Sequence, residues 1–147
     1  MEVKMNIYLD IDGVLIGSNS PQKDRVRFIK YILKHYPDST FWLTSHCRKD
    51  VNRTAEQLQY NGDLPKKLIA KMDRIIQPNG FDTLKTDGID FSKPFLWFDD
   101  NLFYSEKEVL QRHKALDSHI MMNKKEPKMA KIALKILKEQ KLHTDNP

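Results

Sequence analysis

Acidic residues gather directly after two apolar runs of this sequence. Asp10 and Asp12 follow the first run, residues 6–9, and Asp99 and Asp100 follow a later run. An isolated Asp-x-Asp-Gly sequence is usually a turn, but polar residues repeated after successive apolar runs favour a functional site. Carboxylate oxygens suit Mg²⁺, and carboxylates that lie close together need a cation to stay ionised. We therefore expect a Mg²⁺ site built from these residues.

A third apolar run, residues 40–43, also ends in residues that could do chemistry. Thr44, Ser45 and His46 follow it and offer two hydroxyl groups and an imidazole ring. A carboxylate–Mg²⁺ site with a nearby lysine suits phosphoryl transfer, in which the charge of the phosphate oxygens must be neutralised. The residue types therefore indicate chemistry on a phosphate group.

The elements before these residues must bring them together. Apolar spacing predicts alternating strands and helices. The expected strands are residues 6–9, 40–43, 74–76 (weak), 95–98 and 119–122, and the expected helices are 22–35, 50–60, 64–72, 105–114 and 128–141. This alternation favours a parallel sheet covered on both faces. We expect an α/β, Rossmann-like three-layer sandwich with a mainly parallel five-stranded sheet, whose ligands bind at the carboxyl ends of the strands.

Length and composition predict one domain over residues 1–147. The chain has 39% hydrophobic and 31% charged residues and a formal net charge of +5, which excludes collagen-like, disulfide-framework and low-complexity classes. Its one cysteine, Cys47, cannot form an internal disulfide. We expect no signal peptide, because charged residues interrupt the apolar run near the N-terminus, and the sequence has no apolar run long enough to span a membrane. We therefore expect a cytoplasmic protein with no membrane partner.

Three segments resemble motifs of the haloacid dehalogenase-like (HAD) phosphohydrolase superfamily, in the order of the family. Residues 8–15 (YLDIDGVL) closely resemble its first motif, residues 41–44 (FWLT) its second and residues 95–100 (FLWFDD) its fourth. The tryptophan-bearing strands also resemble compact members linked to RNA-repair proteins. The resemblance implies a HAD-like core and a phosphatase that forms an aspartyl-phosphate.

The resemblance implies a role for each matched residue. Asp10 is the expected nucleophile, and Asp12 the acid for the leaving group and then the base for water. Thr44 is expected to hydrogen-bond a phosphate oxygen. Ser45 and His46 follow the matched segment, and their position makes them candidates for contact with the substrate. The implied Mg²⁺ ligands are Asp10, the backbone carbonyl of Asp12, and the pair Asp99 and Asp100, one of which could act through a water molecule.

The third motif of the family is a lysine, for which the sequence offers two candidates. Lys85 stands where a helical turn could begin, and we favour it as the catalytic and phosphate-binding lysine. Lys93 precedes Pro94 and a strand, which would leave it at the amino end of that strand, away from the site.

The inserts that could carry a cap domain are short. Only residues 16–21 separate the first motif from the first helix, and residues 47–85 are partly needed for the core. We therefore expect no full cap and an open site, which by family analogy suits a large substrate such as a nucleic-acid end or a phosphoprotein.

Other interpretations stay open. The fold could serve as a catalytically silent binding module for nucleic acid or protein, although the acidic set favours an enzyme. Dehalogenation at carbon is disfavoured by Asp12, which phosphatase chemistry needs. The basic segment 124–141 could contact phosphates. Its apolar stripe favours the simpler interpretation, in which the segment is a helix that docks on the sheet with its lysines facing the solvent.

Overall fold

The computed structural model describes residues 5–48, 51–60 and 63–145. Four strands form a parallel sheet in the order β2-β1-β5-β6, as follows: β1 Asn6–Leu9, β2 Thr40–Trp42, β5 Phe95–Asp99 and β6 His119–Met121. A separate antiparallel hairpin consists of β3 Cys47–Arg48 and β4 Val51–Asn52. The fold is therefore α/β with a parallel sheet, an architecture compatible with a Rossmann-like fold.

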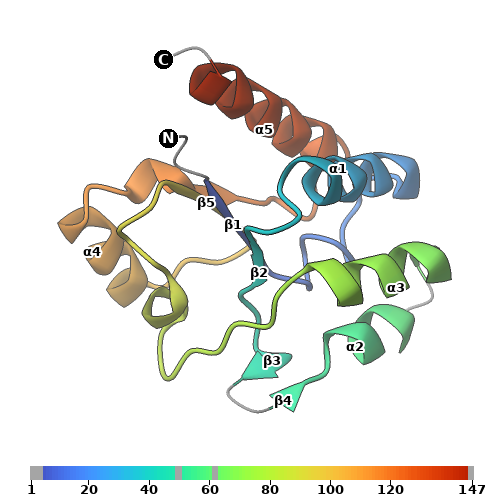
Figure 1. Cartoon of the computed structure of the whole chain (residues 1–147), viewed down its shortest axis with the longest axis horizontal. Coiled ribbons are helices and arrows are strands. Elements are labelled where there is room, and N and C mark those ends of the chain that lie inside the picture. The colour runs from blue at the N-terminus through green and yellow to red at the C-terminus, as the bar shows by residue number, and fades with distance from the viewer. Residues whose placement is uncertain (1–4, 49–50, 61–62, 146–147) are drawn as a thin grey trace.

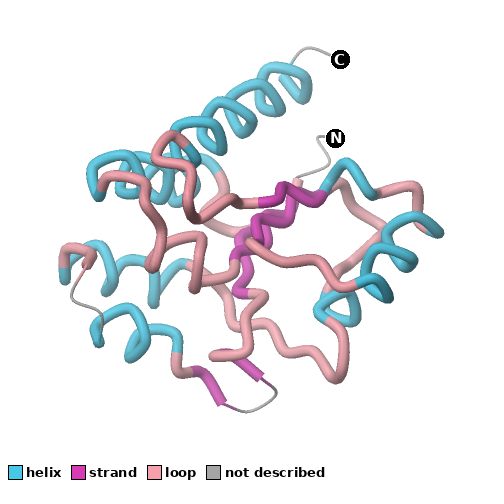
Figure 2. Tube along the Cα trace, turned by 180° about the vertical axis from the view of Figure 1, so that it is seen from behind, coloured by secondary structure: helices cyan, strands magenta, loops and turns pink. Residues whose placement is uncertain are grey.

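Helices lie on both sides of the sheet (Figures 1 and 2). They are α1 Gln22–His35, α2 Thr54–Tyr60, α3 Lys66–Ile75, α4 Tyr104–Arg112 and α5 Met129–Asp145, with the short 3₁₀ helices η1 Lys85–Gly88 and η2 Leu116–Ser118. In the part of the chain that the structure describes, no helix is long and apolar enough to cross a membrane.

Alternating side chains of the strands separate two hydrophobic cores. Ile7 and Leu9 of β1 belong to the larger core, together with Phe28 and other residues of α1, α3 and α5. Tyr8, between them, points to the opposite face and belongs to the smaller core with Leu110 of α4. Because side chains alternate along a strand, the sheet is the middle one of three layers.

The expected strand at residues 74–76 is wrong, and the sheet has four strands instead of five. Helix α3 continues to Ile75, because Leu68, Ile69 and Met72 bury one face of it in the core. What remains of a fifth strand is a single parallel bridge between Gln77 and Phe41. Tertiary burial here overrides the β-propensity of two adjacent isoleucines.

The expected helix over residues 50–60 begins later than predicted. Asp50 lies outside the described residues, and Asn52 belongs to the β3–β4 hairpin, so that α2 begins at Thr54. The side-chain oxygen of Asn52 accepts hydrogen bonds from the backbone N–H and the hydroxyl of Thr54, at 3.1 and 2.6 Å. Asn52 thus turns the chain from the hairpin into the helix.

Candidate active site

Neighbouring parallel strands bring two acidic residues together at the carboxyl edge of the sheet. Strand β1 pairs with β5, and beyond the pairing the N–H of Asp10 donates a hydrogen bond of 3.1 Å to the carbonyl oxygen of Phe98. Asp10 is 7% exposed and Asp99 is 1% exposed. Two carboxyl groups from residues 89 positions apart in sequence therefore share one largely buried environment.

Lys85 of η1 reaches both of these carboxylates. Its Nζ lies 2.7 Å from Oδ2 of Asp99 and 3.1 Å from Oδ2 of Asp10. Backbone groups hold the other oxygens, because the N–H of Ile11 donates to Oδ1 of Asp10 over 2.8 Å and that of Asn101 to Oδ1 of Asp99 over 3.1 Å. Each carboxylate is thus fixed between a cation and a backbone donor.

Two residues that the sequence analysis missed position this group. Glu106 is 2% exposed and accepts hydrogen bonds from the N–H of Lys85 at 2.9 Å and from the N–H of Phe103 at 3.0 Å. It therefore ties the start of α4 to the start of η1. The indole N–H of Trp97 donates to Oδ2 of Asp99 over 3.2 Å. The contact of Glu106 with Lys85 has no local sequence signal, whereas Trp97 and Asp99 lie two positions apart on β5 and therefore share a face of the sheet.

The charges of this cluster do not balance. Burial first, and then the negative charge of Asp10, raise the pKa of Asp99 to about 8, even though the Lys85 ammonium lowers it. Burial alone would lower the pKa of the Lys85 ammonium, but Asp10 and Asp99 outweigh it and hold that pKa above its ordinary value. Because one lysine faces two carboxylates, the cluster retains a proton near neutral pH unless a further cation joins it.

A third carboxylate makes the cluster suitable for a metal ion. Asp10, Asp99 and Asp100 each offer an oxygen, and these oxygens lie within 4.8 Å of one another. Gly13 makes room for this arrangement, since its φ is +78° and a Cβ there would overlap the carboxylate of Asp100. An all-oxygen donor set with an unbalanced negative charge fits a hard divalent cation such as Mg²⁺.

Asp12 lies outside the buried cluster and has different partners. Its side chain is 58% exposed, and its Oδ2 lies 2.7 Å from Nε2 of His46. The side-chain amide of Gln57, on α2, donates to Oδ1 of Asp12 over 3.2 Å. The segment between β2 and β3, which carries His46, and helix α2, which carries Gln57, thus supply the side-chain partners of Asp12. The sequence pointed to His46 as a substrate contact, whereas Gln57 carries no motif that would mark it as part of the site.

The two hydroxyl residues after β2 lie in different environments. Thr44 is fully buried, and its hydroxyl oxygen accepts a hydrogen bond of 3.4 Å from the N–H of His46. Ser45 is exposed. The hydroxyl proton of Thr44 stays available for an acceptor.

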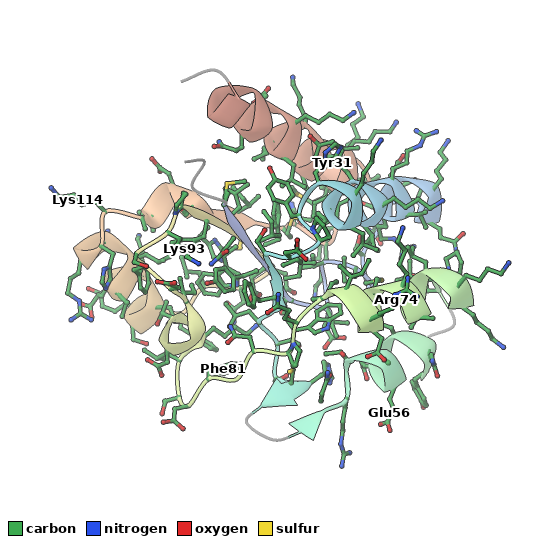
Figure 3. The ribbon with its side chains drawn as sticks, viewed as in Figure 1. Tyr31, Glu56, Arg74, Phe81, Lys93 and Lys114 are labelled. Carbon is green, nitrogen blue, oxygen red and sulfur yellow. The ribbon has the colours of Figure 1, made fainter. Side chains whose placement is uncertain are left out.

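The two candidate lysines also differ in position. Lys93 is exposed and lies before β5 (Figure 3), where the next residue, Pro94, accepts a hydrogen bond from the N–H of Asn6 at the start of β1. That contact belongs to the amino ends of the strands. The structure therefore brings Lys85 to the carboxylates and keeps Lys93 at the opposite edge of the sheet.

No family model matches this chain, and no curated protein or solved structure matches it. The geometry of the site therefore carries the functional conclusion. Chemically, the site combines a buried carboxylate held by a lysine, an exposed carboxylate within reach of water, and a set of oxygens suited to a divalent cation.

Proposed function

We propose that this protein is a Mg²⁺-dependent phosphohydrolase in which Asp10 is the nucleophile. The observation that carries the proposal is the contact of one lysine, Lys85, with the buried carboxylates of Asp10 and Asp99. Such a group neutralises a phosphate while keeping the nucleophile ionised and aligned. The motifs that resemble the HAD superfamily support the same chemistry, a HAD-like core and a site without a full cap.

In the first step, Asp10 attacks the phosphorus atom of a phosphate monoester. The Asp10–phosphorus bond forms and the bond to the leaving oxygen breaks, which gives an aspartyl-phosphate. Asp12 gives its proton to the leaving oxygen, so that an alcohol departs. Lys85 holds Asp10 in line and offsets the charge of the phosphate oxygens, and the hydroxyl of Thr44 donates a hydrogen bond to one of them.

In the second step, a water molecule hydrolyses the aspartyl-phosphate. Asp12, now ionised, takes a proton from that water, whose oxygen attacks phosphorus and releases Asp10 and inorganic phosphate. The exposure of Asp12 supports this role, because a group that gains and loses a proton in each cycle needs access to solvent. His46 and Gln57 keep its carboxylate oriented.

Asp10, Asp99, Asp100 and the backbone carbonyl of Asp12 would hold the Mg²⁺ ion. When bound, the ion supplies positive charge to the transferring phosphate. The raised pKa of Asp99 supports a second cation beside Lys85, because it reflects a carboxyl group that is buried and that lies next to the charge of Asp10. Lys85 and the ion would together bring three positive charges to the clustered carboxylates and the phosphate.

Replacement of Asp10 with Asn tests the proposal directly. We expect D10N to lose at least about 10³-fold of the Mg²⁺-dependent hydrolysis of p-nitrophenyl phosphate, because the amide cannot attack phosphorus. The control is D117N at an exposed residue of η2, for which activity is expected to stay within twofold. Equal activity of D10N and D117N would overturn the proposal. A wild-type protein inactive on all phosphate esters would favour the binding module instead.

A further inference from the structure

Helices α1 and α5 carry matching stripes of basic residues on their outer surfaces. All eight residues are exposed and recur at intervals of three or four, which places each set on one side of its helix: Lys23, Arg27, Lys30 and Lys34 on α1, and Lys128, just before α5, with Lys131, Lys135 and Lys138. Only the second set stands out in the sequence as a basic segment. The basic residues of α1 lie about 100 positions earlier in the sequence, and the two sets come together only because α1 packs against α5.

A groove between the two helices joins the stripes. Arg27, Lys131, Lys135 and Lys138 line it, together with Asp24 and Leu134, and its volume is about 230 Å³. Basic side chains project outward from these helices, and Tyr31 lies where the helices meet (Figure 3). Nζ of Lys138 lies 5.9 Å from the centre of the Tyr31 ring. The stripes thus form one surface, which we call the α1–α5 basic face.

Few acidic groups oppose this charge. Among the described side chains of these two helices, the acidic residues are Asp24, which is 3% exposed, and Glu139, which is exposed. Helix α4, on the other side of the sheet, mixes Lys107 with Glu108 on its surface. The α1–α5 basic face therefore concentrates one sign of charge, whereas α4 alternates the two signs.

The basic face begins at the same edge of the sheet as the candidate active site. Both helices follow strands that end at this edge, and the segments before them are bonded together. The N–H of Asn19 donates to the carbonyl oxygen of Lys124 over 2.7 Å, and the N–H of Ala130 donates to the hydroxyl of Ser20 over 3.0 Å. A long anion on this face can therefore extend toward the site.

We propose that the α1–α5 basic face binds the phosphate backbone of double-helical nucleic acid. Phosphate charges on a duplex recur about every 1.7 Å along the axis, and regularly spaced cations on two helices, each turn about 5.4 Å long, match a linear array of charge. No described aromatic side chain is fully exposed on these helices for bases to stack on. A duplex, whose bases are already stacked, fits this face better than a single strand.

An anionic membrane fits the face less well. Membrane-surface helices insert an apolar face between lipid headgroups. The apolar faces of α1 and α5 are used inside the protein, and Ile132, at 43%, is their one strongly exposed large hydrophobic residue among those described. The outer surface of these two helices therefore offers charged groups to a partner and no apolar face that could insert into a membrane.

The experiment measures duplex binding at several salt concentrations, with EDTA present so that no Mg²⁺-dependent turnover occurs. The ligand is a fluorescein-labelled 20-base-pair DNA without a terminal phosphate. The test variant is R27Q/K131Q/K135Q, and the matched control is K107Q/R112Q/K114N on and after α4, which removes the same charge from another surface (Lys114 is labelled in Figure 3). Thermal melting verifies that both variants are folded.

We expect the test variant to lose more than about tenfold in affinity at 50 mM salt, and the slope of log K against log salt to become about 3 less steep. The control should change the slope by less than about 1, and a single strand should bind more weakly than the duplex. Equal losses in the two variants would mean attraction by net charge alone and would overturn the proposal. Absence of duplex binding, or binding only to vesicles containing phosphatidylserine, would also overturn it. Because catalysis is not measured, failure here leaves the proposed hydrolase activity untouched.

Discussion

The candidate active site contains two acidic regions that are built in opposite ways. Asp10 and Asp99 are buried, and each is fixed between Lys85 and a backbone N–H group. Asp12 is exposed and is held by two side chains, those of His46 and Gln57. The first region suits a group that must stay ionised and aligned. The second suits a group that must exchange protons with water.

The two regions also differ in what their partners contribute: charge balance in the buried region, and orientation of the carboxylate at Asp12. In the buried region the number of cations decides the protonation state, because water screens these charges only weakly. At Asp12, water screens the charge, and the contribution of its partners is mainly geometric. Changes in the buried region should therefore have the larger effects, and they should depend on pH.

The largest effect is expected from Lys85→Met, which keeps the bulk of the side chain and removes its charge. Activity should fall at least about 10³-fold, since both alignment of Asp10 and neutralisation of phosphate are lost. Stability should fall by about 3 kcal/mol, because one partner of a buried ion pair is removed. The loss of stability should be smaller at pH 6 than at pH 8.5, because the raised pKa of Asp99 lets a proton on that carboxyl replace the ammonium at the lower pH. Urea unfolding at the two pH values measures it.

The control for that measurement is Lys93→Met, at the exposed lysine on the other edge of the sheet. It should leave both activity and unfolding within error of the parent protein. A K85M protein that is as active and as stable as K93M would mean that the buried cluster does not need its lysine.

The second-largest effect is expected from Mg²⁺, which should bind the buried acidic region and stabilise the folded protein. Mg²⁺ at ten times its Kd should raise Tm by about 4 °C. Binding requires ionised Asp99, whose raised pKa makes a proton compete with the metal. Apparent affinity should therefore fall up to tenfold for each pH unit below that pKa, and the shift in Tm should be larger at pH 8.5 than at pH 6.5. Differential scanning fluorimetry measures both.

The variants D99N/D100N and D73N/D117N separate the site from general binding of cations. The first removes two of the clustered carboxylates and should abolish the shift. The second removes two exposed acids elsewhere and should retain it. A shift that survives in D99N/D100N would place the metal outside the cluster.

The smallest effect is expected at Asp12, from His46→Ala. Asp12 keeps its contact with Gln57 and its access to water, so kcat/KM should fall only about three- to tenfold on an alkyl phosphate, whose leaving oxygen needs a proton. On p-nitrophenyl phosphate, whose leaving group needs little assistance, it should fall less than twofold. An equal loss on both substrates would indicate that His46 supports the fold and does not orient Asp12.

Local sequence patterns were sufficient for much of the fold. The expected strand at residues 6–9 and the expected helix at 22–35 agree with β1 and α1, because a short β-prone run and a regular apolar spacing each specify their element locally. The strand expected at 74–76 failed because burial of one face of α3 extends that helix. The β3–β4 hairpin was missed, since pairs of two residues have almost no pattern.

The acidic residues of the site could be predicted from the sequence. Most of the residues that contact and position them could not. Asp10 and Asp99 follow apolar strands, so the topology of a parallel sheet brings them to one edge. Glu106 contacts the backbone of Lys85 from 21 positions away, and Gln57 contacts Asp12 from 45 positions away. Such contacts depend on how helices pack, which the spacing of residues within one segment does not encode.

The hydrogen bond from Trp97 to Asp99 gives the molecule an optical reporter. Indole emission and near-ultraviolet dichroism respond to the charge next to the ring nitrogen, and this nitrogen lies 3.2 Å from the carboxylate oxygen that Lys85 also contacts. Protonation of Asp99, or arrival of a cation beside it, changes that charge. The state of the acidic cluster can therefore be followed in the unlabelled protein, in real time and in the absence of any substrate.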